Sequence, residues 1–103
     1  MLEVFLEVFK KACEKRCFDF VPRDKNMDLL DSLGLTKMQA IKELCRKLSA
    51  EHYIGGPEKD KDQVRGGEVW MFKLNLWEIE VYVKLKVFTS NGKYCIKCIS
   101  FHV

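Results

Sequence analysis

Two segments near the C-terminus carry residue types that could cleave RNA without a metal ion. Residues 78–90 alternate between apolar and polar side chains, as a strand with one buried and one open face does. The polar set includes Tyr82, Lys84 and Lys86. Cleavage needs a base for the ribose 2′-hydroxyl, an acid for the leaving 5′-oxygen and cations near the phosphate. Lysines and a tyrosine on an open face could hold phosphates, donate a proton or stack on a base.

The second segment, residues 93–103, contains Ser100 and His102. Histidine titrates near neutral pH, so His102 could act as either acid or base. Its position depends on the register of the hairpin around Asn91-Gly92. A two-residue turn there would turn Ser100 and His102 into the core and set Lys86 against a second lysine, Lys97.

A register with one extra residue, in the turn or as a bulge, separates apolar from polar side chains better. Its cross-strand pairs are Tyr82 with His102, Lys84 with Ser100, and Lys86 with Cys98. We therefore expect a bulged hairpin whose candidate catalytic residues are Tyr82, Lys84 and His102. Lys86 and Ser100 are the candidates for phosphate binding. The alternative is a solvated strand face without a catalytic role.

Residues 54–67 form the one clear loop in the sequence and hold four of its six glycines. Such a loop can be a connector or a flap that covers a substrate. Arg65 could bind a phosphate with its guanidinium fork if the loop folds over the open face. Tyr53, just before the loop, could be structural or could contact RNA.

The N-terminal half predicts helices. Apolar residues recur with helical spacing over residues 2–16, and a short helix can run from an Asn26 cap to Gly34. Thr36 and Gln39 form a capping box for a helix that reaches about Leu48. Between these helices, residues 18–21 are a short extended piece, at best an edge strand, because proline follows them.

The C-terminal part predicts strands over residues 68–75, 78–90 and 93–103. Sequential strands joined by short turns pair antiparallel. We expect one α+β domain whose N-terminal helices pack on one face of a C-terminal antiparallel sheet. Its parts are a helical region (1–53), the glycine-rich loop (54–67) and the sheet (68–103).

Composition and charge narrow the class of protein. With 103 residues, of which 48 % are hydrophobic and 32 % charged, the chain suits one small folded domain. Acids interrupt the apolar N-terminal stretch, so we expect neither a secretory signal nor a membrane span, and hence a cytoplasmic protein. Residues 81–103 hold four lysines and no acid. This basic region suits a polyanion such as nucleic acid, or it is simply a solvated surface.

The five cysteines predict neither disulfides nor a metal site. An odd number without a signal sequence argues against a disulfide scaffold. Cys13 and Cys17 share one face of the predicted helix, where they can be small core residues. Cys95 and Cys98 have the spacing of a zinc knuckle, but they would point to opposite faces of a strand. We therefore expect no metal and no other cofactor.

Several short motifs along the chain resemble those of a known family. They are Leu48-Ser-Ala-Glu-His-Tyr53, Gly56-Pro57, Gly67-Glu-Val-Trp70, Glu80-Val-Tyr-Val-Lys-Leu85 and Cys98-Ile-Ser-Phe-His102. In this order, after an N-terminal helix, they resemble the MqsR-type toxins of bacterial and archaeal toxin–antitoxin modules. The resemblance covers nearly the whole chain and is strongest in its last 36 residues.

The resemblance implies a RelE-like fold, metal-independent endoribonuclease action on mRNA, and a cognate antitoxin as protein partner. Tyr82 and Lys84 match the strand tyrosine and lysine of the family. Founding members of the family have a lysine at the position of His102. A sub-group of the family has a histidine there, as this chain does. Ile54 and Met71 replace a lysine and a glutamine of the founding members. The alternative reading is an RNA-binding or protein-interaction domain that has this fold and no catalysis.

Overall fold

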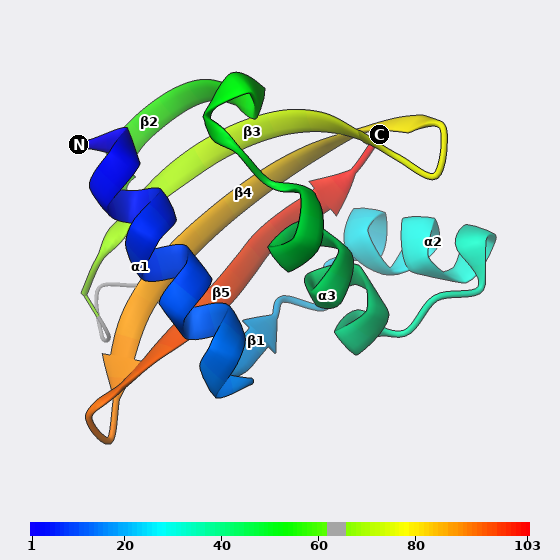
Figure 1. Cartoon of the computed structure of the whole chain (residues 1–103). Coiled ribbons are helices and arrows are strands. Elements are labelled where there is room, and N and C mark those ends of the chain that lie inside the picture. The colour runs from blue at the N-terminus through cyan, green and yellow to red at the C-terminus, as the bar shows by residue number, and fades with distance from the viewer. Residues whose placement is uncertain (62–65) are drawn as a thin grey trace.

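A mixed β-sheet and the helices packed against it make up the described part of the chain, residues 1–61 and 66–103 of a computed structural model (Figure 1). Within these residues the helices are α1 (Leu2–Lys15), α2 (Asp24–Leu33), α3 (Lys37–Lys47) and the 3-10 helix η1 (Ala50–His52). The strands are β1 (Phe18–Phe20), β2 (Tyr53–Lys59), β3 (Glu68–Leu76), β4 (Ile79–Ser90) and β5 (Lys93–His102). They lie in the order β1-β5-β4-β3-β2. The expected α+β class is confirmed.

Two helix ends form where the sequence predicts them. The Thr36 hydroxyl accepts a hydrogen bond from the Gln39 amide at 3.1 Å, and the Gln39 side chain accepts one from the Thr36 amide at 2.8 Å. This is the predicted capping box at the start of α3. Gly34 ends α2 with a φ of 66°, a left-handed conformation that glycine adopts without steric cost.

The predicted start of α2 is wrong. The helix begins at Asp24, so Asn26 lies inside its first turn instead of capping it. Asn26 is fully buried on the same helix face as Leu29 and Leu30. Its side chain can therefore form hydrogen bonds with the backbone of a neighbouring strand.

Strands β3, β4 and β5 form the expected antiparallel meander. Two-residue turns connect them at Trp77-Glu78 and Asn91-Gly92, and all four residues have positive φ angles. The sheet as a whole is not antiparallel, because β1 pairs with β5 in parallel, with Phe18 opposite Ile96. A three-residue strand carries too weak a sequence pattern to reveal its direction.

The first part of the segment predicted to be a loop over residues 54–67 is a strand. β2 occupies Tyr53–Lys59 and forms the edge of the sheet beside β3, with two register shifts. Gly56 has a φ of 100°, and a Cβ atom there would lie 2.7 Å from the Val69 carbonyl oxygen. Glycine is thus required here by close backbone approach in an irregular edge strand.

The hydrophobic core lies between the sheet and the helices α1 and α3, which cover the same side of the sheet in Figure 1. α2 lies beside the C-terminal end of β5. Most of the core side chains are aliphatic, and aromatic rings stack among them. Phe5 of α1 stacks on Trp70 and Phe72 of β3. We call the other side of β3, β4 and β5, which α1 and α3 leave uncovered, the open face.

The structure contains two disulfides, and the prediction of none was wrong. Cys13 of α1 is bonded to Cys45 of α3, and Cys17 is bonded to Cys95 of β5. Their Cα–Cα distances are 5.9 and 4.7 Å. The fifth cysteine, Cys98, is a buried free thiol, which accounts for the odd number. Cys13 and Cys17 therefore bond to different elements instead of packing together.

Candidate functional site

Tyr82 of β4 and His102 of β5 lie directly opposite each other on the open face. Their ring centroids are 5.4 Å apart, with 35° between the ring planes. Both residues are partly exposed, so a ligand on this face can reach both. The predicted pairing of these two residues is confirmed.

Lys84 follows Tyr82 on the same face and lies opposite Ser100, which is also the predicted pairing. The Lys84 side chain is 30 % exposed, and its Nζ lies 3.6 Å from Oε1 of Glu58 on β2. Ser100 is only 4 % exposed, so its hydroxyl is nearly covered. Of this pair, Lys84 is the group that a phosphate can reach.

A β-bulge at Ile99 produces this arrangement. Lys84 pairs with Ser100, but the next residue, Leu85, pairs with Cys98, so Ile99 has no partner on β4. Between the bulge and the turn, the strands follow the register of a plain two-residue turn. Each of the two registers considered from the sequence thus holds over one part of the hairpin.

The prediction for Lys86 is wrong about its cross-strand partner and about its exposure to solvent. It pairs with Lys97 instead of Cys98, and its side chain is fully buried. Oδ2 of Asp60 accepts hydrogen bonds from Nζ of Lys86 at 2.7 Å and from Nζ of Lys97 at 3.0 Å. This carboxylate compensates two facing lysines that would otherwise repel each other. Lys86 therefore has a structural ion pair where an exposed phosphate ligand was predicted.

Asn26 anchors β5 at the bulge, a role that the sequence analysis missed. Its Oδ1 accepts a hydrogen bond from the Phe101 amide at 2.9 Å. Its Nδ2 donates to the carbonyls of Ile99 and Val21, both at 2.9 Å. These bonds satisfy backbone groups of β5 beyond the end of β1. The available signal was a polar residue on the apolar face of α2, three positions before Leu29.

The immediate surroundings of His102 suit a proton acceptor. Its Nδ1 lies 3.1 Å from the backbone oxygen of Val103. A proton on Nδ1 can be donated to that oxygen, and Nε2 then carries the free lone pair. A hollow of about 410 Å³ adjoins the ring and is also lined by Lys25, Asp28 and Ser32 of α2.

Tyr53, another predicted contact residue, is not part of this cluster. The Tyr53 ring packs against Trp70 and Phe72, whose side chains face the helices, and its hydroxyl donates to the Gly56 carbonyl at 2.6 Å. Tyr53 therefore lies at the edge of the sheet, away from Tyr82 and His102. Arg65 lies outside the described residues.

The residues that replace family positions have distinct places. Met71 of β3 lies opposite Lys84, so it borders the cluster. Lys73, which is not one of these two positions, lies opposite Tyr82 and forms an exposed ion pair with Glu80 at 3.9 Å. Ile54 lies on the edge strand and is 51 % exposed.

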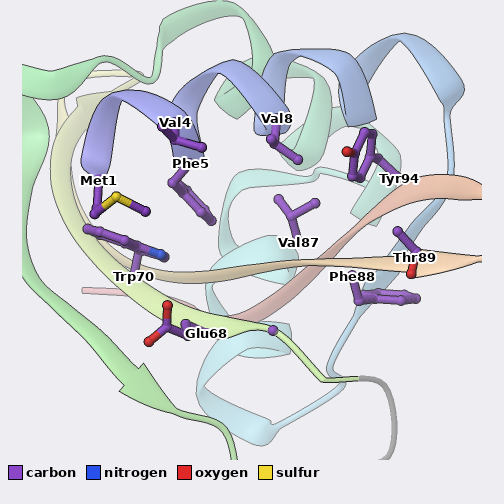
Figure 2. Close-up of a pocket in the computed structure, with 11 residues that line it drawn as sticks. Met1, Val4, Phe5, Val8, Glu68, Trp70, Val87, Phe88, Thr89 and Tyr94 are labelled. Atoms are coloured by element: carbon purple, nitrogen blue, oxygen red, sulfur yellow. The ribbon is translucent and has the colours of Figure 1, made fainter.

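An apolar groove of about 310 Å³ lies on the α1 side of the sheet (Figure 2). Met1, just before α1, and Val4 and Val8 of α1 border it, and Phe5 points from the helix toward Trp70. This groove is separate from the open face, and among its described lining residues Glu68 and Tyr94 are the ones with titratable side chains.

Burial raises the pKa of the Cys98 thiol far above its ordinary value. Among the described residues, no three histidine, cysteine or acidic side chains come together as a metal site. In the same residues, no helix has the length and apolar character needed to cross a bilayer. Comparisons with protein-family models, curated proteins and solved structures find no match to this chain.

Proposed function

We propose that this protein is a metal-independent endoribonuclease that cleaves mRNA, with a RelE-like fold, as in the MqsR-type toxins that it resembles. The observation that carries the proposal is the pair of Tyr82 and His102, with Lys84 next to it on the same open face. The three side chains provide two groups for proton transfer and one cation within a single exposed cluster.

The proposed reaction assigns one role to each side chain. Nε2 of His102 takes the proton of the ribose 2′-hydroxyl, whose oxygen attacks the adjacent phosphorus. The bond from phosphorus to the 5′-oxygen breaks, and the Tyr82 hydroxyl donates a proton to that oxygen. The ammonium group of Lys84 stabilises the negative charge that grows on the phosphate. The products are a 2′,3′-cyclic phosphate and a 5′-hydroxyl.

A contact of the His102 ring supports this division of roles. The contact between Nδ1 and the Val103 oxygen favours a proton on Nδ1 and a lone pair on Nε2. The proposed reaction needs no metal and no other cofactor, because the nucleophile is part of the substrate.

The proposal also includes a partner and a compartment. A ribonuclease of mRNA must be restrained in the cell that makes it, and the resemblance supplies a cognate antitoxin protein for that role. Its substrate places the protein in the cytoplasm. Both disulfides would be reduced there, so the fold would rely on its hydrophobic core.

The test compares an RNA of mixed sequence with the same RNA carrying 2′-O-methyl groups, both incubated with purified protein and a chelator. We expect cleavage of the first only, with 2′,3′-cyclic phosphate ends. Cleavage of the methylated RNA would contradict attack by the 2′-hydroxyl. Binding of both without cleavage, on free RNA and on ribosome-bound mRNA, would favour a non-catalytic RNA-binding domain.

A further inference from the structure

A small basic hollow lies on the open face beyond Lys84, and neither the sequence motifs nor the proposed reaction uses it. Its volume is about 140 Å³. The described residues that line it are Arg23, Glu58, Lys59, Asp60, Lys61, Val69, Lys84 and Ile99. Four of these eight residues are cationic.

Three separate parts of the chain bring these cations together. Arg23 precedes α2, Lys59 ends β2 and Lys61 follows it, whereas Lys84 comes from the middle of β4. The buried side chains of Val69 and Ile99 form apolar walls. The bulge at Ile99 therefore shapes the hollow as well as the position of His102.

Among the described lining residues, the two acids do not cancel the positive charge of the four cations. The Asp60 carboxylate accepts hydrogen bonds from Lys86 and Lys97, which compensate it. Glu58 lies 3.6 Å from Lys84 and is half exposed. Arg23, Lys59 and Lys61 are exposed, so their charged groups can reach an anion in the hollow.

The hollow lies in line with the candidate catalytic pair. Lys84 lines the hollow and adjoins the pair, because it is two residues from Tyr82 on the same face of β4. Two residues of a strand span about 7 Å. A single-stranded RNA with one phosphate at Tyr82 and His102 can thus extend along β4 and place a neighbouring phosphate at Arg23, Lys59 and Lys61.

We infer that this basic hollow is a subsite for an RNA backbone phosphate next to the one that is cleaved. The inference rests on the proposed function for its choice of RNA as the ligand. Lysines supply the charge, and the Arg23 guanidinium can bind phosphate oxygens with two hydrogen bonds. Glu58 competes with the phosphate for Lys84.

Binding of an uncleavable RNA tests the subsite separately from catalysis. The probe is a fluorescein-labelled octanucleotide of mixed sequence with 2′-O-methyl groups on every sugar, measured by anisotropy over a range of salt concentrations. In the triple variant R23A/K59A/K61A, the slope of log K against log salt should become shallower by about 0.7 for each phosphate contact removed. All three side chains are exposed, so the variant should fold normally.

The matched control is K37A/K42A/K47A, which removes the same charge from exposed positions on α3. It should keep the wild-type slope, because α3 lies on the other side of the sheet. An equal loss in both triple variants would show only a general charge effect and would overturn the subsite.

A second variant tests the subsite through an expected gain in affinity for the RNA probe. E58Q removes the acid that pairs with Lys84 and should tighten binding of the probe about threefold. E80Q removes an acid from an exposed ion pair with Lys73 and should leave the affinity closer to wild type, because Glu80 does not line the hollow. Weaker binding by E58Q would contradict the inference.

The outcomes separate the subsite from the proposed function. If the triple variant loses salt-dependent contacts while the wild type cleaves no RNA, the subsite stands and the proposed catalysis falls. If the wild type cleaves RNA and the triple variant binds the probe unchanged, the subsite falls and the catalysis stands. Displacement of the probe by micromolar inorganic phosphate would assign the hollow to free phosphate and overturn the assignment to RNA.

Discussion

Tyr82 and His102 lie opposite each other, with ring centroids 5.4 Å apart, because one extra residue of β5 is accommodated at Ile99. Continued without this bulge, the register from the Asn91-Gly92 turn would place Phe101 opposite Tyr82. His102 would then point toward the helices. The candidate site therefore depends on a local irregularity of one strand.

Asn26 is expected to hold this irregularity in place. Replacement by alanine removes its hydrogen bonds to the Ile99 carbonyl and the Phe101 amide. We expect N26A to lower the free energy of unfolding by about 1–3 kcal/mol for each buried backbone group left without a partner. Urea denaturation measures this loss, and nuclear Overhauser contacts between Tyr82 and His102 report on the register.

The control for N26A is S32A on the same helix. Ser32 donates a hydrogen bond to the Leu29 carbonyl, within α2 itself. Its removal should change stability by less than about 1 kcal/mol and leave the register intact. An N26A protein with wild-type stability and register would contradict the anchoring role.

Asp60 is expected to stabilise the fold because its carboxylate accepts hydrogen bonds from two lysines, Lys86 and Lys97. D60N keeps the size of the side chain but removes the charge between Lys86 and Lys97. Breaking a buried ion pair from one side costs about 3–5 kcal/mol. We therefore expect a large fall in the urea midpoint of D60N.

The exposed ion pair of Lys73 and Glu80 provides the comparison for D60N. Its atoms are 3.9 Å apart, and both side chains are well exposed. E80Q should cost less than about 1 kcal/mol. If D60N costs no more than E80Q, the ion pair contributes little to the fold.

The disulfide between Cys17 and Cys95 should stabilise the oxidised protein. It closes a loop with a sequence separation of 78 residues. Loop-closure entropy predicts a loss of about 4 kcal/mol when C17S/C95S is compared with the oxidised wild type. Thermal unfolding of the two oxidised proteins measures this loss, and a reductant, which also opens the Cys13–Cys45 bond, should remove the difference between them.

Cys95 pairs with Phe88, six residues from Tyr82 along β4, which is a distance of about 20 Å. Reduction should therefore leave the rate of any RNA cleavage unchanged at temperatures where the reduced protein is folded. A cleavage rate that falls on reduction of folded protein would show that the disulfide supports the site as well as the fold.

Cys98 should resist alkylation in the native protein. Burial raises the pKa of its thiol, so the reactive thiolate is scarce at neutral and mildly alkaline pH. Iodoacetamide at pH 8 should label Cys98 only after the chain is unfolded, as peptide mapping can show. Rapid labelling of folded protein would contradict its burial.

Features encoded by local sequence were predictable. The capping box of Thr36 and the alternation over residues 78–90 each depend on neighbours in the chain, and both appear where expected. The pairs of Tyr82 with His102 and of Lys84 with Ser100 followed from sorting apolar from polar side chains across a bulge. The sequence did not show that the bulge lies at Ile99 instead of at the turn.

Features that depend on distant contacts were not predictable. Asp60 lies 26 residues from Lys86 and 37 from Lys97, and only the folded sheet brings the three together. The irregular strand β2 was read as a loop because its glycines and proline obscure any alternation. The disulfide partners of Cys13 and Cys17 likewise depend on packing that residue spacing does not encode.

The most direct test of the proposed function compares RNA cleavage by the wild type, H102A and H52A in the presence of a chelator. The chain has two histidines, and His52 binds the Ser49 amide at the start of η1, away from the open face. We expect the wild type and folded H52A to cleave RNA and H102A to lose at least about 100-fold in rate. Cleavage by H102A at the wild-type rate would contradict the catalytic pair of Tyr82 and His102.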